Sequence, residues 1–121
     1  MKLDTTQEGL YSLYSPHEAE ILKHLWDTAQ TPGSAKKSLH VHNWQLDALP
    51  DIGLKSKSRA TIINFLNELV DDGVLDYKER TGKGGYHRMY YIRLTRDDFE
   101  GHVRKTIADK LDEIFGVTED D

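Results

Sequence analysis

The stretch "RTGKGGYHR" at residues 80–88 combines three glycines with three permanent cations, a tyrosine and a histidine. Glycine-rich loops bind phosphate when they leave a strand and open a helix whose N–H groups face the anion. Here both flanks, "VLDYKE" and "RMYYIRLT", are rich in β-branched and aromatic residues, which is typical of strands. The stretch is therefore predicted to be the tip of an antiparallel hairpin. Gly82, Gly84 and Gly85 would serve the turn, and the cations would project into solvent.

Six histidines provide a second candidate chemistry, because neutral imidazole binds zinc, copper or nickel. The "HVH" at residues 40–42 would place two imidazoles on the same side of a strand. A metal site needs three or four convergent ligands, and the sequence has no second HxH, HExxH or cysteine partner. We therefore expect no metal ligands, and a metal-responsive regulator stays an alternative.

Several carboxylates could in principle supply acid–base pairs for catalysis. They stand beside predicted turns or helix ends, where solvated carboxylates are common, and no nucleophile motif accompanies them. The residues in question are Asp47, Asp51, Asp71, Asp72 and Asp76. We expect no catalytic residue and no cofactor, so the chain is not predicted to be an enzyme.

Charge is distributed unevenly along the chain. The 121 residues carry a net charge of −5, but residues 54–93 hold eight lysines and arginines against five acids. From residue 97 onward nine acids face three bases. A local positive charge is what a phosphate backbone requires, so the middle of the chain is the candidate contact region.

Length and composition set broad limits. A chain of 121 residues is expected to form one domain, and without cysteine it has neither disulfides nor thiolate ligands. No apolar run approaches the roughly 20 residues of a membrane span, and the start of the chain lacks the apolar centre of a signal peptide. These features predict a soluble protein in the cytoplasm.

Helix-start signals divide the chain into elements. "SPHE" at residues 15–18 predicts a capping box, and apolar residues follow it at helical spacing until "TPGS" at 31–34. A short helix is expected at residues 43–49, ended by Pro50 and Gly53. Ser58 is the predicted N-cap of an amphipathic helix that ends at Gly73. The hairpin follows, and "TRDD" at 95–98 predicts a last long helix.

This order of elements predicts an α+β, mainly helical winged helix-turn-helix fold with a two-stranded wing and a C-terminal dimerisation helix. The expected parts are an N-terminal extension (1–14), a DNA-binding domain (15–95), the dimerisation helix (96–116) and an acidic tail (117–121). "SPHEAEILKHLW", "SRATIINFLNELVDDGVLDY" and "RMYYIRL" resemble the first helix, recognition helix and wing of the penicillinase repressor (BlaI/MecI) family. "KTIADKLDEIFG" is similar to the start of that family's dimerisation region.

The resemblance implies a repressor that binds double-stranded DNA, with the recognition helix in the major groove and the wing on the backbone or minor groove. Arg59, Thr61 and Asn64 would meet base edges, because their donors and acceptors suit them. The phosphate contacts would come from Lys55, Lys57, Ser58, Lys83 and Arg88, with His87 as a further wing residue.

The last helix carries an apolar stripe that few later residues could cover. Such a stripe predicts a homodimer interface, with parallel and antiparallel pairing both open. Its members are Phe99, Val103, Ile107, Leu111, Ile114 and Phe115. A winged helix that serves only as a protein interaction module is the remaining alternative, since the overall charge is negative.

Overall fold

In the computed structural model, which describes residues 1–83 and 85–116, four α-helices accompany a three-stranded antiparallel sheet. The helices are α1 (Pro16–Thr28), α2 (Ser38–Asp51), α3 (Arg59–Asp71) and α4 (Arg96–Phe115). The strands are β1 (Lys36–Lys37), β2 (Leu75–Gly82) and β3 (Gly85–Ile92), and two 3₁₀ helices span Gly9–Ser12 and Pro32–Ser34. This arrangement is α+β, mainly helical, and is consistent with a winged helix fold. Gly84 and the predicted acidic tail at 117–121 lie outside the described residues.

The predicted caps start the helices where the sequence places them. The backbone N–H of Ser15 donates to Glu18 Oε1 at 3.1 Å, which is one half of the expected capping box. Ser58 Oγ accepts the backbone N–H of Thr61 at 3.2 Å at the start of α3. Thr95 Oγ1 does the same for the third residue of α4 at 3.2 Å. Each cap satisfies an amide that has no partner inside its helix. The start of these three helices could therefore be predicted from a few neighbouring residues.

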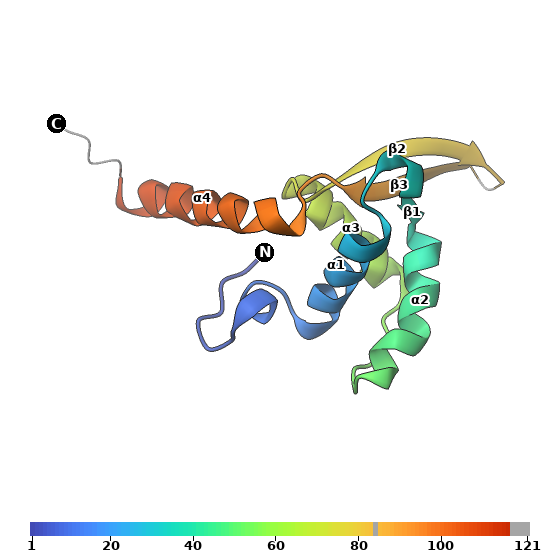
Figure 1. The fold of residues 1–121 in the computed structure, drawn as a ribbon, viewed down its shortest axis with the longest axis horizontal. Coiled ribbons are helices and arrows are strands. Elements are labelled where there is room, and N and C mark those ends of the chain that lie inside the picture. Colours follow the sequence, from blue (N-terminus) through green and yellow to red (C-terminus); the bar gives the residue numbers. More distant parts are fainter. Residues whose placement is uncertain (84, 117–121) are drawn as a thin grey trace.

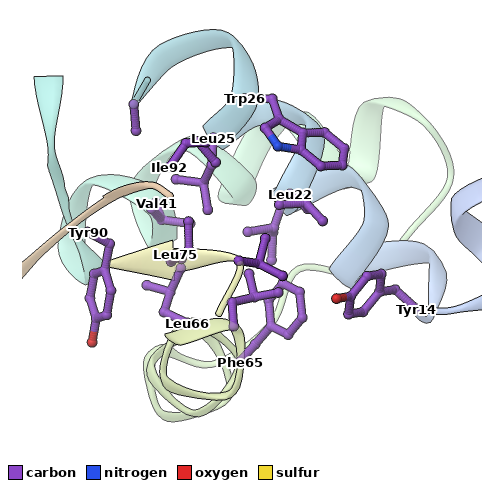
Figure 2. Packing of buried hydrophobic residues seen from close by; sticks show 14 of the residues in the cluster. Tyr14, Leu22, Leu25, Trp26, Val41, Phe65, Leu66, Leu75, Tyr90 and Ile92 are labelled. Carbon is purple, nitrogen blue, oxygen red and sulfur yellow. The ribbon is translucent and has the colours of Figure 1, made fainter. Parts of the chain in front are cut away.

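The core lies where α1, α3 and the inner ends of β2 and β3 meet, and Figure 2 shows their apolar side chains converging. Leu22, Leu66 and Leu75 are almost fully buried there. The indole Nε1 of Trp26 donates to the backbone oxygen of Leu94 at 3.0 Å, so the largest core side chain also has its polar atom satisfied. This core fixes α3 against the sheet and leaves the opposite face of α3 open.

The segment between α1 and α3 differs from its prediction in three ways. The expected short helix at 43–49 is the longer α2, which keeps Pro50 inside its last turn, while Gly53 follows with a φ of 82°. His40 and His42 belong to this helix, so the expectation of two imidazoles on one side of a strand is wrong. Strand β1 adds a third strand beside β3, where the sequence predicted only two.

The hairpin of β2 and β3, called the wing from here on, projects beyond the helices (Figure 1). Its strands pair antiparallel from Leu75 opposite Ile92 to Gly82 opposite Gly85. Gly85 has a φ of 102°, as the turn prediction requires, whereas Gly82 continues the strand. The wing is therefore an extended two-stranded hairpin that ends in a turn with glycine at positions 82 and 85.

Helix α4 points away from the rest of the fold on the side opposite the wing (Figure 1). Its first turns are anchored, because Phe99 and Val103 are buried in the core and Phe99 packs edge-on to Trp26 at 5.2 Å. The expected open stripe is therefore corrected for these two residues, which the chain itself covers. Ile107 packs partly against the core, and the exposed apolar remainder consists of Leu111, Ile114 and Phe115.

Candidate nucleic-acid interface

A groove of about 650 Å³ separates α3 from the wing, with the start of α2 at one end. It is called the α3–wing groove below. The residues that line it are Lys37, Ser38, Leu39, Arg59, Ile63, Asn67, Lys83, Tyr86, His87, Arg88 and Tyr90. Four of the residues predicted to bind DNA are thus brought together from two elements that are far apart in sequence: Arg59, Lys83, His87 and Arg88.

Helical spacing places one stripe of α3 along this groove. Arg59, Ile63 and Asn67 recur every four residues and share a side of the helix, while Ile62 and Leu66 are buried on another side. The buried side is fixed by the core, so the groove side cannot rotate away. The position of Arg59 therefore follows from the same periodicity that builds the core.

The wing is attached to α3 through Asn67, a residue that the sequence analysis did not single out. Asn67 Oδ1 accepts hydrogen bonds from Arg88 Nη1 at 3.0 Å and from the Tyr90 hydroxyl at 2.7 Å. The Arg88 guanidinium also stacks over the Tyr77 ring at 4.0 Å. Burial raises the pKa of Tyr90, so its hydroxyl keeps the proton that it donates. Arg88 is consequently a fixed cation in the wall of the groove, whereas the sequence placed it at a free hairpin tip.

The lining of the groove carries a positive formal charge, which comes from four lysines and arginines. Of the described residues that line it, none is an aspartate or glutamate. Within residues 1–83 and 85–116, no carboxylate forms an ion pair with the four permanent cations of the groove, which are Lys37, Arg59, Lys83 and Arg88.

Three of the cations of α4 are paired with carboxylates. Arg104 pairs with Glu100 at 2.9 Å and Lys105 pairs with Asp109 at 2.8 Å. Lys110 approaches Glu113 at 3.4 Å. These three cations are neutralised by carboxylates of their own helix, whereas no such pairing is found for the four cations of the α3–wing groove within residues 1–83 and 85–116.

The other predicted contact residues lie outside the groove but on the same end of α3. Asn64 is exposed on the outward face of the helix, and the hydroxyls of Ser58 and Thr61 lie 3.0 Å apart at its first turn. Lys55 is exposed and Lys57 is half-buried in the segment before α3. They extend the polar surface from the groove toward the start of the helix.

The turn between α2 and α3 is held by a buried glutamine that the sequence analysis missed. Gln45 is fully buried, and its side chain bonds to both backbone groups of Lys57, the residue before the N-cap of α3. A signal was present in the sequence, because Val41, Gln45 and Leu49 share helical spacing and the outer two are core residues. A polar residue on a core-facing stripe indicates a buried partner.

Metal binding finds no support in the described ranges, 1–83 and 85–116. No three histidine, aspartate or glutamate side chains in them converge as a metal site would require. His24 instead stacks on Trp44, with ring centroids 3.8 Å apart, and His102 lies 3.0 Å from the backbone oxygen of Asp72. In the same part of the chain, no helix has both the length and the apolar character needed to cross a membrane.

Comparison with known proteins shows that the fold of this chain is similar to that of a solved structure. No protein family model matches the chain, and no curated protein sequence matches it. Among solved structures, the chain is similar to a possible transcriptional regulator from Methanosarcina mazei Go1, with a TM-score of 0.56. The match covers 84% of this chain and 73% of that one at 13% sequence identity. At this identity the likeness shows a shared fold, and it does not single out the penicillinase repressor family.

Proposed function

We propose that this protein is a sequence-specific regulator of transcription, a repressor, that binds double-stranded DNA through the α3–wing groove. The observation that supports this most directly is a set of four cations, Lys37, Arg59, Lys83 and Arg88, around a groove between a helix and a hairpin, with no ion pair to a carboxylate of residues 1–83 and 85–116. Phosphates supply most of the affinity of proteins for DNA, and they require such cations. The shared fold with a possible transcriptional regulator is a second, weaker support.

Helix α3 is proposed to enter the major groove with its first turns toward the bases. Arg59 can give two hydrogen bonds to O6 and N7 of guanine, and the exposed Asn64 can pair with N6 and N7 of adenine. Thr61 is the third candidate, although its hydroxyl is shared with Ser58 at the N-cap. These contacts would carry the sequence preference, since base edges differ in the major groove.

The α3–wing groove is proposed to straddle one DNA strand. Lys83 on the wing and Lys37 at the start of α2 would contact phosphates from either side, with Arg88 fixed between them. His87 lines the same wall. Lys55, Lys57 and Ser58 would contact the backbone beside the N-terminus of α3, where helix amides also favour an anion.

A homodimer is proposed from the exposed end of α4. Leu111, Ile114 and Phe115 are 49%, 60% and 77% exposed, and the adjoining Ile107 is half-buried. The apolar groove beside them, about 600 Å³, also includes Leu3 and Leu13 of the N-terminal segment. A second copy of α4 would cover this surface, and two copies would present two α3 helices to the two halves of a palindromic site.

The same apolar surface also favours a second candidate, a protein interaction module without DNA binding. In that case α4 would contact a different protein, and the net charge of −5 would pose no obstacle. Selection from a pool of random duplexes separates the two functions. A DNA-binding regulator enriches a common motif over successive rounds. If the pool stays random and no duplex is retained at low salt, DNA binding is excluded and the protein interaction module is the remaining candidate function.

A further inference from the structure

Tyr86 is a large aromatic side chain left in solvent near the outer end of the wing. It is 77% exposed, as much as Phe115 at the end of α4, and these two exceed the other large apolar side chains of the described residues. It lines the α3–wing groove together with Lys83, Arg88 and Arg59. Its ring therefore adds an exposed apolar surface beside the cations of the groove.

The geometry of the hairpin determines which way Tyr86 faces. Side chains alternate along a strand, so Tyr86 lies on the same face of β3 as Arg88 and Tyr90. Those two residues bond to Asn67 of α3, so this face of the wing is turned toward the helix. Tyr86 continues that face outward, past the point where the wing touches α3.

Small residues lie opposite the ring and beyond it, toward the end of the hairpin. Tyr86 is paired with Thr81 across the hairpin, and the next pair outward is Gly82 with Gly85. Neither glycine carries a side chain that could cover the ring. The imidazole of His87, the following residue, lies close to Gly82.

We propose that Tyr86 inserts its ring into the DNA minor groove, on the far side of the strand that the α3–wing groove straddles. This inference rests on the proposed function. With α3 in the major groove, a hairpin that reaches across the intervening phosphates arrives at the adjacent minor groove. The ring then packs against sugars and base edges, and its hydroxyl meets the N3 and O2 acceptors there.

The contact gives a sequence preference at positions that α3 does not touch. The minor groove of A·T pairs lacks the guanine amino group and is narrow in A-tracts, so an inserted ring meets less obstruction and closer walls. We infer a preference for A·T pairs on the wing side of the site. This preference is separate from the major-groove preference carried by Arg59.

The test compares the wild-type chain with Tyr86→Phe and Tyr86→Ala on a duplex recovered by selection. A second version of that duplex carries 2,6-diaminopurine in place of adenine in the flanks. This base adds an amino group to the minor groove and keeps the major-groove edge of adenine. Tyr11→Ala is the matched control, because Tyr11 is exposed and lies outside the α3–wing groove.

We expect Tyr86→Ala to weaken binding to the natural duplex about 5- to 50-fold, the scale of a lost aromatic contact with nucleic acid. Tyr86→Phe keeps the ring and should stay within about threefold of wild type. Diaminopurine should weaken binding by the wild type and have little effect on Tyr86→Ala. Tyr11→Ala should bind both duplexes like the wild type.

Other results would distinguish a failure of the Tyr86 contact from a failure of DNA binding itself. If the wild type binds duplex and Tyr86→Ala binds equally well, the minor-groove contact is wrong and the DNA-binding function stands. An equal diaminopurine penalty for wild type and Tyr86→Ala places the ring outside the minor groove and also overturns the inference. A wild type that binds no duplex, or prefers a single strand of the same sequence, removes the proposed function and this contact with it.

Discussion

Gln45 and Lys57 are joined by two hydrogen bonds across the turn between α2 and α3. The Lys57 N–H donates to Gln45 Oε1 at 2.7 Å, and Gln45 Nε2 donates to the Lys57 carbonyl at 3.0 Å. The same Nε2 also reaches the carbonyl of His42 at 3.1 Å. Because Lys57 immediately precedes the N-cap of α3, this pair fixes where the proposed recognition helix begins relative to α2.

Replacing Gln45 with leucine should destabilise the fold. The leucine side chain fills much of the volume of the buried glutamine but cannot bond to either Lys57 backbone group, which should lower the free energy of unfolding by about 1 to 3 kcal/mol. Urea unfolding measures it. Gln7→Leu, at an exposed position, should change that free energy by less than about 0.5 kcal/mol. Equal unfolding midpoints for Gln45→Leu and wild type would show that the two bonds do not hold the turn.

Arg59→Ala and Lys83→Ala should weaken DNA binding in different ways. The Arg59 change removes a base contact of about 1 to 3 kcal/mol, so the selected duplex should lose more affinity than a random duplex. The Lys83 change removes a phosphate contact, so both duplexes should lose affinity alike and the salt slope should fall by about one unit. Arg104→Ala, which removes an ion-paired cation of α4, serves as the control. If Arg59→Ala and Lys83→Ala each weakened binding to the selected and the random duplex by the same factor, the assignment of Arg59 to a base and Lys83 to a phosphate would be wrong.

Leu111→Asp should dissociate the proposed homodimer. A charge buried in an apolar interface without a partner costs several kcal/mol, so the variant should sediment as a monomer at tens of micromolar. Leu111 is preferable to Ile107, whose partial packing against the core would mix folding with assembly. Leu46→Asp is the matched control, since Leu46 is 45% exposed against 49% for Leu111 and lies on α2. A wild-type chain that is already monomeric at this concentration would contradict the dimer.

Stability should decrease in mild acid because of His24. Burial lowers the pKa of His24 below its ordinary value of 6.5, and the charge of Lys36 adds to this while Asp27 opposes it. The unfolded chain therefore binds the proton more tightly, so stability is complete above about pH 6.5 and falls as the pH drops through that value toward the folded pKa. Thermal unfolding between about pH 7.5 and 5.5 would show the loss.

A phenylalanine at position 24 provides the comparison. It keeps a ring stacked on Trp44 but cannot titrate, so His24→Phe should lose less stability over the same pH range. Some pH dependence should remain, because burial also lowers the pKa of His17. An identical pH dependence in wild type and His24→Phe would exclude His24 as its source.

Structural features that depend on residues close together in the sequence could be predicted from the sequence. The start of α1 at Ser15, the start of α3 at Ser58 and the antiparallel hairpin follow from caps, periodicity and strand-forming residues, and the structure confirms them. Features made by distant residues could not be predicted in this way. Strand β1 has two residues, too few for a pattern, and it exists because they pair with Met89 and Tyr90.

The same distinction between local and distant residues applies to the candidate site. The sequence shows the cations of α3 and the wing, but their common groove depends on Asn67, which bonds to residues 21 and 23 positions further along the chain. The extent of the apolar stripe on α4 was overestimated for a related reason. Periodicity identifies which residues share a face, whereas the cover over Phe99 is supplied by Trp26 and Tyr14 from the other end of the chain.

Binding of the wild-type chain to duplex DNA across a range of salt concentrations tests the central claim most directly. The five cations proposed to contact phosphate, Lys37, Lys55, Lys57, Lys83 and Arg88, predict that log affinity falls linearly with log salt, with a slope of about −4 to −5 for each protomer between about 50 and 200 mM. The combined groove variant Lys37→Ala, Lys83→Ala and Arg88→Ala should lower the magnitude of this slope by about three units, whereas Arg104→Ala with Lys105→Ala should keep it. No duplex binding by the wild type at the lowest salt, or a slope that the groove variant leaves unchanged, would contradict the account.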